Sequence, residues 1–308
     1  MPIDNRPQDT ILPHCRGDSI VYRVRTLIPA LLLCAILALL SSYLQEALRR
    51  YARASRVRVF AAPMALSAFF CALVWSCGVH SPGLMAVIAA YTFAPTLLAF
   101  ARRSDFLIIL TLWLPLEFAV GANLVPRALQ GFFHTVAYGI AILLALWIFL
   151  IFRELPGMKY NLPSGARDLI TPLIGYAGVA PVLIPIGLWL SFIQPFHVPP
   201  NLTFSLVLKT FLLILVATAF PEEILFRALI QNSLMQKLGF TNRTLVLAAV
   251  IFGCAHLNNG PGPLPNWRYA IMATIAGFAY GKVFQKSSSV FSSAILHALI
   301  NTSKHVFF

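Results

Sequence analysis

Three short motifs in the second half of the chain place charged, imidazole and amide side chains inside segments that are otherwise apolar. They are Glu222-Glu223-Ile-Leu-Phe-Arg227, Phe252-Gly-Cys-Ala-His256 and His297-Ala-Leu-Ile-Asn301. A charged side chain inside a bilayer costs roughly 2.5–3.5 kcal/mol on insertion scales, so charges at these positions indicate a function or a buried partner.

The spacing within the motifs predicts which side chains meet. Residues at i and i+4 share one helix face, so Glu223 and Arg227 can neutralise each other, and His297 and Asn301 point to one place. Glu222 lies about 100° further round the helix and points elsewhere.

The distances of the motifs from the turns predict a common depth. Glu223 and His256 each lie about 16 residues from the polar turn at Gly239 and Phe240, which is about 24 Å along an antiparallel helix pair. His297 lies about 11 residues beyond the next turn on that side, at roughly 16 Å. We therefore expect separate helices to bring a carboxylate, two imidazoles and an amide into one buried layer.

Two kinds of hydrolytic chemistry fit this set of side chains. A carboxylate partnered by histidine can take a proton from water, and a second histidine and an amide can donate to the oxyanion that forms on a peptide carbonyl. Two histidines and one carboxylate, here Glu222, His256 and His297, are also a recurring catalytic zinc set. The sequence leaves open a glutamic-type enzyme that needs no cofactor and an enzyme that uses Zn²⁺. The H-E-x-x-H motif of soluble metalloproteases is absent. The G-x-S-x-G motif is also absent, so serine hydrolysis has no support.

Taken in this order, the three motifs resemble those of the CPBP family. That family comprises CAAX prenyl endopeptidases of the Ras-converting type and bacterial abortive-infection or bacteriocin-immunity relatives. Its EExxxR, FxxxH and HxxxN patterns are intact here, and the resemblance covers residues 169–308. It implies an intramembrane endopeptidase of glutamic or metal-dependent type, acting on a membrane-anchored protein or peptide.

The resemblance also implies a role for each motif residue. The catalytic residues would be Glu222, His256, His297 and Asn301. The first two would activate the water, and the last two would stabilise the oxyanion. Structural support would come from Glu223, Arg227 and Phe252.

The composition is that of a membrane protein. The chain is 59% hydrophobic and 11% charged, whereas soluble domains carry about 25% charged residues. Apolar segments near 20 residues long recur throughout, which predicts an all-α, polytopic transmembrane bundle of about 9–10 spans with a buried site formed by the C-terminal helices. The candidate spans are 27–45, 59–78, 83–101, 106–124, 132–152, 169–193, 205–237, 243–258, 268–285 and 288–303.

A polar connection at 153–168 divides the spans into two groups. It predicts a polar N-terminal segment at 1–26, an N-terminal transmembrane bundle of unknown role at 27–160 and a CPBP-like protease core at 161–308. Four cysteines fall in apolar segments and are predicted to be buried free thiols, namely Cys34, Cys71, Cys77 and Cys254.

The net charge of +13 is concentrated in alternate loops. The positive-inside rule places the basic loops in the cytoplasm, where they would anchor on anionic lipid, so the lipid bilayer and not nucleic acid is the expected partner. The opposite loops and the C-terminus hold only Arg127, Arg268 and Lys304. The four arginines within residues 1–26 fall on this sparse side and disagree with the rest. We predict a multi-pass protein of a prokaryotic plasma (inner) membrane.

Two alternatives from other functional classes remain. Intramembrane Glu, His and Arg also occur in proton-coupled transporters, although the sequence lacks the paired broken helices of carriers built from inverted repeats. The second alternative is a non-catalytic immunity or scaffold protein of the membrane, against which the intact motif residues argue.

Overall fold

The computed structural model describes residues 18–260 and 263–308, and within them it contains helices and turns but no strand. The all-α prediction is therefore confirmed. The first half of the chain forms α1 (Asp18–Ala38), α2 (Ser42–Arg53), η1 (Arg56–Phe60), α3 (Ala61–Ser76), α4 (Pro82–Phe100), α5 (Asp105–Glu117), η2 (Ala122–Leu124), α6 (Arg127–Ala145) and η3 (Leu146–Phe152).

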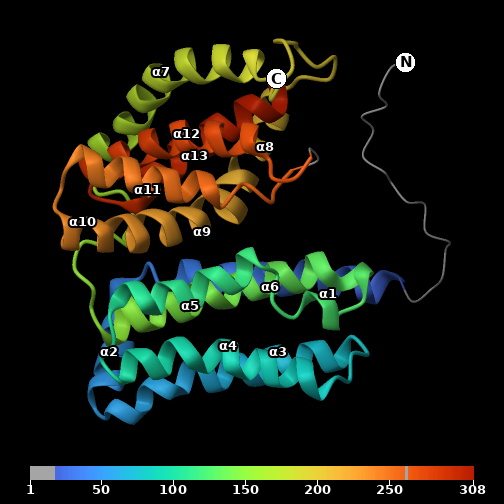
Figure 1. The fold of residues 1–308 in the computed structure, drawn as a ribbon, viewed down its shortest axis with the longest axis vertical. Coiled ribbons are helices and arrows are strands. Elements are labelled where there is room, and N and C mark those ends of the chain that lie inside the picture. The colour runs from blue at the N-terminus through green and yellow to red at the C-terminus, as the bar shows by residue number, and fades with distance from the viewer. Residues whose placement is uncertain (1–17, 261–262) are drawn as a thin grey trace.

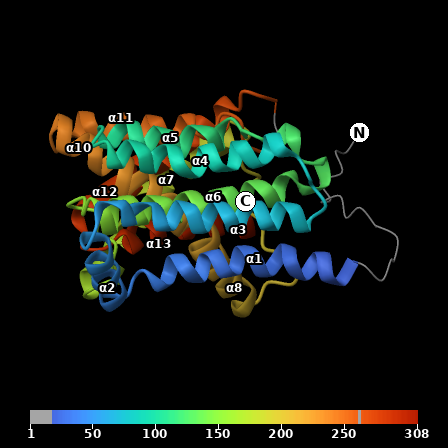
Figure 2. The same cartoon turned by 90° about the horizontal axis from the view of Figure 1, so that it is seen from below.

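The second half of the chain contains the three motifs. It forms α7 (Ala166–Trp189), α8 (Phe204–Ile214), η4 (Leu215–Ala219), α9 (Phe220–Glu223), η5 (Ile224–Gln231), α10 (Asn232–Leu238), α11 (Asn242–Cys254), α12 (Trp267–Lys286) and α13 (Val290–Phe307). Most long helices run along one common direction, with α1–α6 in the lower half of Figure 1 and α7–α13 in the upper half (Figures 1 and 2). The domain boundary near residue 160 stays a prediction.

Every predicted span overlaps a helix, but fewer helices qualify as spans than the predicted nine or ten. Among the described residues, five helices are long and apolar enough to cross a membrane, or six if the bent pair of α1 and α2 counts as one. Two long helices that fall short, α12 and α13, carry Gly, Ser, Thr and the residues of the third motif. Helix α12 carries Arg268, Lys282 and Lys286 towards its ends, and α13 carries serines, a threonine, His297 and Asn301, so both are less apolar than the five qualifying helices.

The predicted span 27–45 is wrong at its C-terminal end. Helix α1 stops at Ala38, and the chain turns by 86° into α2. Ser41 begins the new helix by accepting a hydrogen bond from the Leu44 amide. Gln45 is buried and donates to the Tyr160 carbonyl at 3.3 Å. The polar Gln45 of α2 therefore contacts protein at the end of the bundle, and α2 lies across this end and does not extend α1.

The loops predicted to be cytoplasmic gather at one end of the bundle, on the left in Figure 1. Arg153 pairs with Asp105 at the start of α5 at 3.2 Å, and Lys282 donates to Asn242 Oδ1 at 2.7 Å. The up-and-down course of the helices therefore explains why basic and sparsely charged loops alternate. Which membrane face this end occupies stays a prediction.

The connection after η3 is fixed to the same end by Lys159. Its Nζ donates to the carbonyls of Phe284 at 2.7 Å, Gln285 at 3.3 Å and Ser287 at 2.8 Å. The last carbonyls of a helix have no partner within the helix, so the ammonium satisfies the C-terminus of α12.

The prediction of buried thiols is wrong, because none of the four cysteines is fully buried. Cys34 and Cys254 are exposed, and Cys71 and Cys77 are half-buried. An apolar face of a membrane helix can be satisfied by lipid as well as by protein, so an apolar neighbourhood in the sequence does not imply burial.

We expect Lys159→Met to destabilise the protein. The variant leaves the carbonyls at the end of α12 without their donor, which costs about 1.5–3 kcal/mol for hydrogen bonds to a charged group. Thermal unfolding in detergent measures the loss, with Lys286→Met, an exposed lysine at the end of α12, as the control. Equal melting temperatures for the two variants would contradict the assignment.

We expect the basic end to face the cytoplasm. In a background without native cysteines, an impermeant maleimide should label Asn201→Cys in intact cells, because Asn201 is exposed in the loop between α7 and α8. Ser55→Cys, exposed beside the basic α2–η1 turn, should react only after the membrane is opened. The reverse labelling pattern would overturn the orientation.

Candidate active site

The first motif lies within one continuous 35-residue helix, Phe204–Leu238, whose backbone widens on both sides of the glutamates. The π-helical segments η4 and η5 flank α9, which holds Pro221, Glu222 and Glu223. Proline lacks an N–H and its ring clashes with the carbonyl one turn earlier, so a wider turn at η4 accommodates Pro221.

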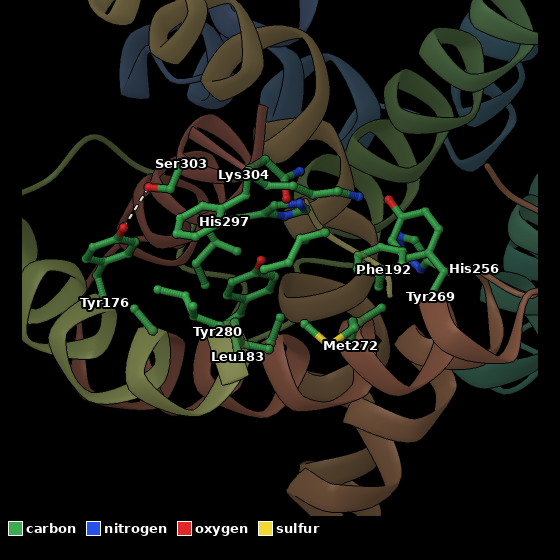
Figure 3. Close-up of a pocket in the computed structure, with 18 of the residues that line it drawn as sticks. Tyr176, Leu183, Phe192, His256, Tyr269, Met272, Tyr280, His297, Ser303 and Lys304 are labelled. Carbon is green, nitrogen blue, oxygen red and sulfur yellow. Dashed lines mark hydrogen bonds between the residues drawn. The ribbon is translucent and has the colours of Figure 1, made fainter. Parts of the chain in front are cut away.

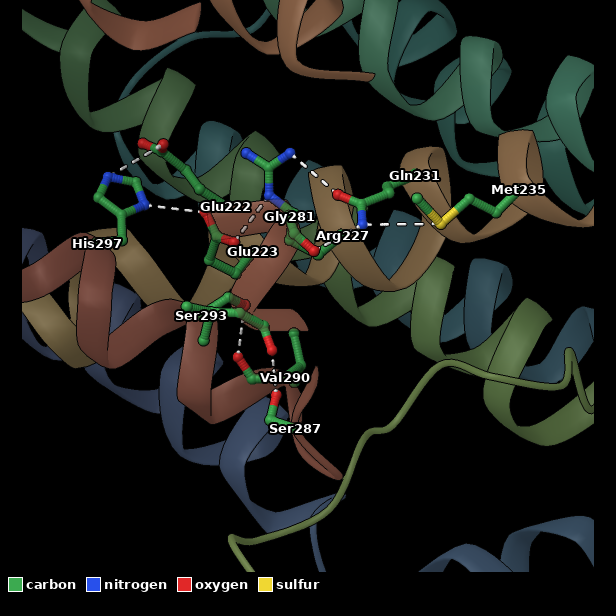
Figure 4. A network of polar contacts seen from close by, with 11 residues as sticks. Glu222, Glu223, Arg227, Gln231, Met235, Gly281, Ser287, Val290, Ser293 and His297 are labelled. Carbon is green, nitrogen blue, oxygen red and sulfur yellow. Dashed lines mark hydrogen bonds and ion pairs between the residues drawn. The ribbon is translucent and has the colours of Figure 1, made fainter. Parts of the chain in front are cut away.

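A ladder of buried polar side chains follows the glutamates at four-residue intervals (Figure 4). Arg227 Nε donates to Glu223 Oε2 at 3.0 Å, and both side chains are 0% exposed. Arg227 Nη1 lies 3.5 Å from Gln231 Oε1, and Gln231 Nε2 donates to the Gly281 carbonyl at 3.1 Å. The predicted ion pair therefore forms, and the hydrogen bond of Gln231 links the motif helix to α12.

Close approach of α12 depends on two glycines one turn apart. A Cβ at Gly277 would lie 2.8 Å from the Phe252 ring, and one at Gly281 would lie 2.4 Å from Gln231 Oε1. The Arg227 guanidinium lies over the rings of Phe252 at 4.8 Å and Tyr280 at 5.7 Å, which adds cation–π attraction to the ion pair.

His297 lies between the two glutamates (Figure 4). Its Nδ1 is 3.1 Å from Glu223 Oε1, and its Nε2 is 3.9 Å from Glu222 Oε2. The imidazole stacks on Tyr280 with ring centres 4.6 Å apart. Since a carboxylate only accepts, Nδ1–H donates to Glu223, and Nε2 is the nitrogen that faces Glu222.

Glu222 points away from the ion pair, as the sequence predicts. Its Oε2 is buried and has no hydrogen-bond partner among the residues that the structure describes. The 3.9 Å separation from His297 Nε2 is too long for a direct hydrogen bond.

His256 lies just beyond the end of α11 and makes different contacts. Its Nδ1 is 2.8 Å from the Phe252 carbonyl, and its ring meets Tyr269 edge-on at 4.6 Å. Phe252 also packs against His297 at 5.9 Å, so one ring supports both histidines. The contacts of His256 in the described part of the chain do not include Glu222.

A pocket brings the second and third motifs together (Figure 3). His256, His297 and Asn301 all line it, and apolar side chains of α7, α12 and α13 form most of the remaining wall. The glutamates lie behind His297 and are not among the lining residues. At the far side, Lys304 Nζ lies over the rings of Phe192 at 3.8 Å and Tyr269 at 5.0 Å.

The predicted zinc ligands do not form a ligand group as they are placed. Among residues 18–260 and 263–308, no group of three or more His, Cys, Asp or Glu side chains is arranged to hold a metal ion. Glu222 and His297 are neighbours, but His256 has no contact with Glu222 among the described residues, and its Nδ1 bonds to the Phe252 carbonyl, which leaves Nε2 free.

The sequence did not single out three residues that the structure places around the motifs. Gln231 continues the four-residue spacing from Arg227, and that pattern could have revealed it. Tyr280 of α12 stacks on His297, and Lys304 of α13 lines the pocket. Only these spatial contacts, and no motif, connect the two residues with the site.

Comparison with known proteins identifies one region of the chain. Residues 204–303 match the family described as type II CAAX prenyl endopeptidase Rce1-like. The matched region runs from α8 into α13, so it contains all three motifs. No curated protein and no solved structure matches the chain significantly.

We expect Arg227→Met to destabilise the protein by about 3–5 kcal/mol, because it leaves the Glu223 carboxylate buried without its cation. Thermal unfolding in detergent measures the loss, and Arg243→Met, on an exposed position of α11, is the control. The double variant Glu223→Gln/Arg227→Met should recover part of the loss, since it removes both charges. A single variant as stable as the control would show that the pair contributes little.

Proposed function

We propose that this chain, whose residues 204–303 match the Rce1-like family of type II CAAX prenyl endopeptidases, is an intramembrane endopeptidase of that family. It hydrolyses a peptide bond of a membrane-associated protein or peptide. The proposed setting is the plasma (inner) membrane of a prokaryote. One observation carries the proposal beyond the family match, namely the position of His297 between Glu223 and the unpartnered Oε2 of Glu222.

Glu222 is the proposed general base. A water that reaches the Glu222 carboxylate, whose side chain is 23% exposed, gives up a proton to it as the water oxygen attacks the peptide carbonyl carbon. His256 assists as an acceptor: its Nδ1–H donates to the Phe252 carbonyl, so Nε2 of the neutral ring is free to accept from water. The proton held by Glu222 then passes to the leaving amine, and the peptide bond breaks.

His297 and Asn301 are the proposed oxyanion donors. They lie one helical turn apart on α13, and both line the pocket. The Asn301 amide donates N–H, and His297 donates Nε2–H when both ring nitrogens are protonated. The hydrogen bond to Glu223 fixes the imidazole orientation, and Arg227 in turn fixes Glu223.

The pocket indicates the kind of peptide that binds. Most of its lining side chains are aliphatic or aromatic, including Leu183, Met272 and Ile300. An apolar peptide segment leaves water for such a wall more readily than a charged one. We therefore propose that the substrate has an apolar segment next to the bond that is cleaved.

We expect Glu222→Gln to lower cleavage of a quenched apolar peptide library by at least about 100-fold, the usual effect of losing a general base. The thermal stability should stay close to that of the wild type, because Glu222 makes no hydrogen bond among the described residues. Glu46→Gln, the same substitution on α2, is the control and should cleave normally. A Glu222→Gln variant with full activity would contradict the mechanism.

A chelator arm of the same experiment decides between the glutamic and the metal-dependent alternative. We propose that cleavage persists with chelator, because the placed residues form no three-ligand group. Loss of cleavage with chelator, together with about one bound zinc per chain, would assign Glu222, His256 and His297 as the ligands of a catalytic site.

The remaining alternatives predict different results. A proton-coupled transporter would cleave nothing and would move protons in liposomes until Glu222 is replaced. A scaffold or immunity protein would cleave nothing, and its phenotype in cells would survive Glu222→Gln.

A further inference from the structure

One positive charge in the pocket has no role in the mechanism proposed above. Lys304 lies on the last turn of α13 and is half-buried. It lines the same pocket as His256, His297 and Asn301. Helix α13 begins at the basic end of the bundle and runs away from it, so Lys304 lies apart from the loops whose charge the positive-inside rule explains (Figure 1).

Two aromatic rings hold the ammonium group of Lys304 in the pocket (Figure 3). Its Nζ lies 3.8 Å from the centre of the Phe192 ring and 5.0 Å from that of the Tyr269 ring. The two rings pack against each other at 5.1 Å, and Tyr269 also meets the ring of His256 at 4.6 Å. The ammonium group therefore belongs to the same cluster of side chains as one of the proposed catalytic histidines.

No anion of the protein accounts for this charge. Within residues 18–260 and 263–308, no carboxylate pairs with Lys304 and no carbonyl accepts a hydrogen bond from its Nζ, whereas Nζ of Lys159 donates to three carbonyls. The aromatic rings attract the charge but give its three N–H groups no strong acceptor. A cation in a mostly apolar pocket is costly without an anion, so we expect the ligand of the pocket to bring one.

The position of Lys304 on α13 relates this charge to the bond that is cleaved. His297, Asn301 and Lys304 lie at positions i, i+4 and i+7, which share one helix face. At 1.5 Å per residue, Lys304 lies about 4.5 Å beyond Asn301 and about 10.5 Å beyond His297 along the helix axis. An extended peptide advances about 3.3 Å per residue. An anion bound at Lys304 would therefore belong to a residue about one to three positions from the cleaved bond.

We propose that Lys304 is a specificity-determining residue, which binds a carboxylate of the substrate about one to three residues from the cleaved bond. This inference rests on the proposed function, because it takes His297 and Asn301 to mark the position of that bond. The ammonium group donates charge-assisted hydrogen bonds to the carboxylate. The carboxylate is either the free C-terminus of the peptide or an acidic side chain, and the residues around it stay apolar to suit the pocket wall.

The test uses two pairs of peptides that differ only in charge. All are built on the apolar sequence that binds the wild type most tightly. One pair ends in a free carboxylate or in a carboxamide. The other pair ends in a carboxamide and carries a glutamate or a glutamine within the apolar segment. The wild type should cleave the charged member of one pair with a kcat/KM about 10-fold higher, as expected for hydrogen bonds to a charged group. The pair that shows this preference identifies the source of the carboxylate.

Lys304→Met should abolish this preference and should change kcat/KM for the neutral peptides by less than about three-fold. Lys304→Arg keeps the charge and should keep most of the preference. Arg268→Met is the matched control, since it removes a positive charge from an exposed position of α12 that does not line the pocket. It should keep the full preference. An equal loss on charged and neutral peptides in Lys304→Met, or no preference in the wild type, would overturn the inference.

Peptide binding gives a readout that does not depend on cleavage. Fluorescence anisotropy of the labelled peptides is measured with the full chain in detergent, in the Glu222→Gln background. Adding Lys304→Met should weaken binding of the charged peptide about 10-fold and leave the neutral peptide unchanged. Lys304→Gln replaces Lys304→Met if the latter does not fold. Unchanged binding of the charged peptide would overturn the inference. The expected loss of binding without any cleavage by the wild type would support the carboxylate site and contradict only the proposed function.

Discussion

The buried ion pair between Glu223 and Arg227 is the interaction on which the arrangement of the C-terminal helices depends. Both side chains are 0% exposed, and an uncompensated charge at this depth would be strongly destabilising. The compensation comes from three helices: His297 of α13 bonds to the carboxylate, Gln231 continues the ladder, and Gly281 of α12 leaves room for it. Moving any of these helices away would leave a buried charge or amide without its partner, so the ion pair favours the observed packing.

The direction of Glu222 follows from the same pair. Side chains of adjacent helix residues point about 100° apart. Because Glu223 points at Arg227 and His297, Glu222 points in a different direction. His297 contacts Glu223 through Nδ1, and its Nε2 faces Glu222. A structural ion pair therefore fixes the orientation of the proposed catalytic groups.

The sequence predicts contacts within one helix better than contacts between helices. The four-residue spacing predicted the ion pair of Glu223 and Arg227 because one helix geometry determines it. No spacing could predict that Tyr280 of α12 stacks on His297 of α13, because this contact depends on how separate helices pack. The bend after α1 was missed for a related reason, since apolar content does not indicate where a helix ends.

The helices of the two halves differ in hydropathy, and the difference reflects what each helix packs against. Among the candidate spans, α6 with η3 has the highest hydropathy, 2.5, and the largest buried share, 72%. This segment is therefore apolar because it packs inside protein, whereas α13 is less apolar because it carries His297 and Asn301 of the site. In a helix of this kind a tyrosine hydroxyl without a partner is costly. Tyr138 is such a residue, because its buried hydroxyl makes no hydrogen bond within the described part of the chain.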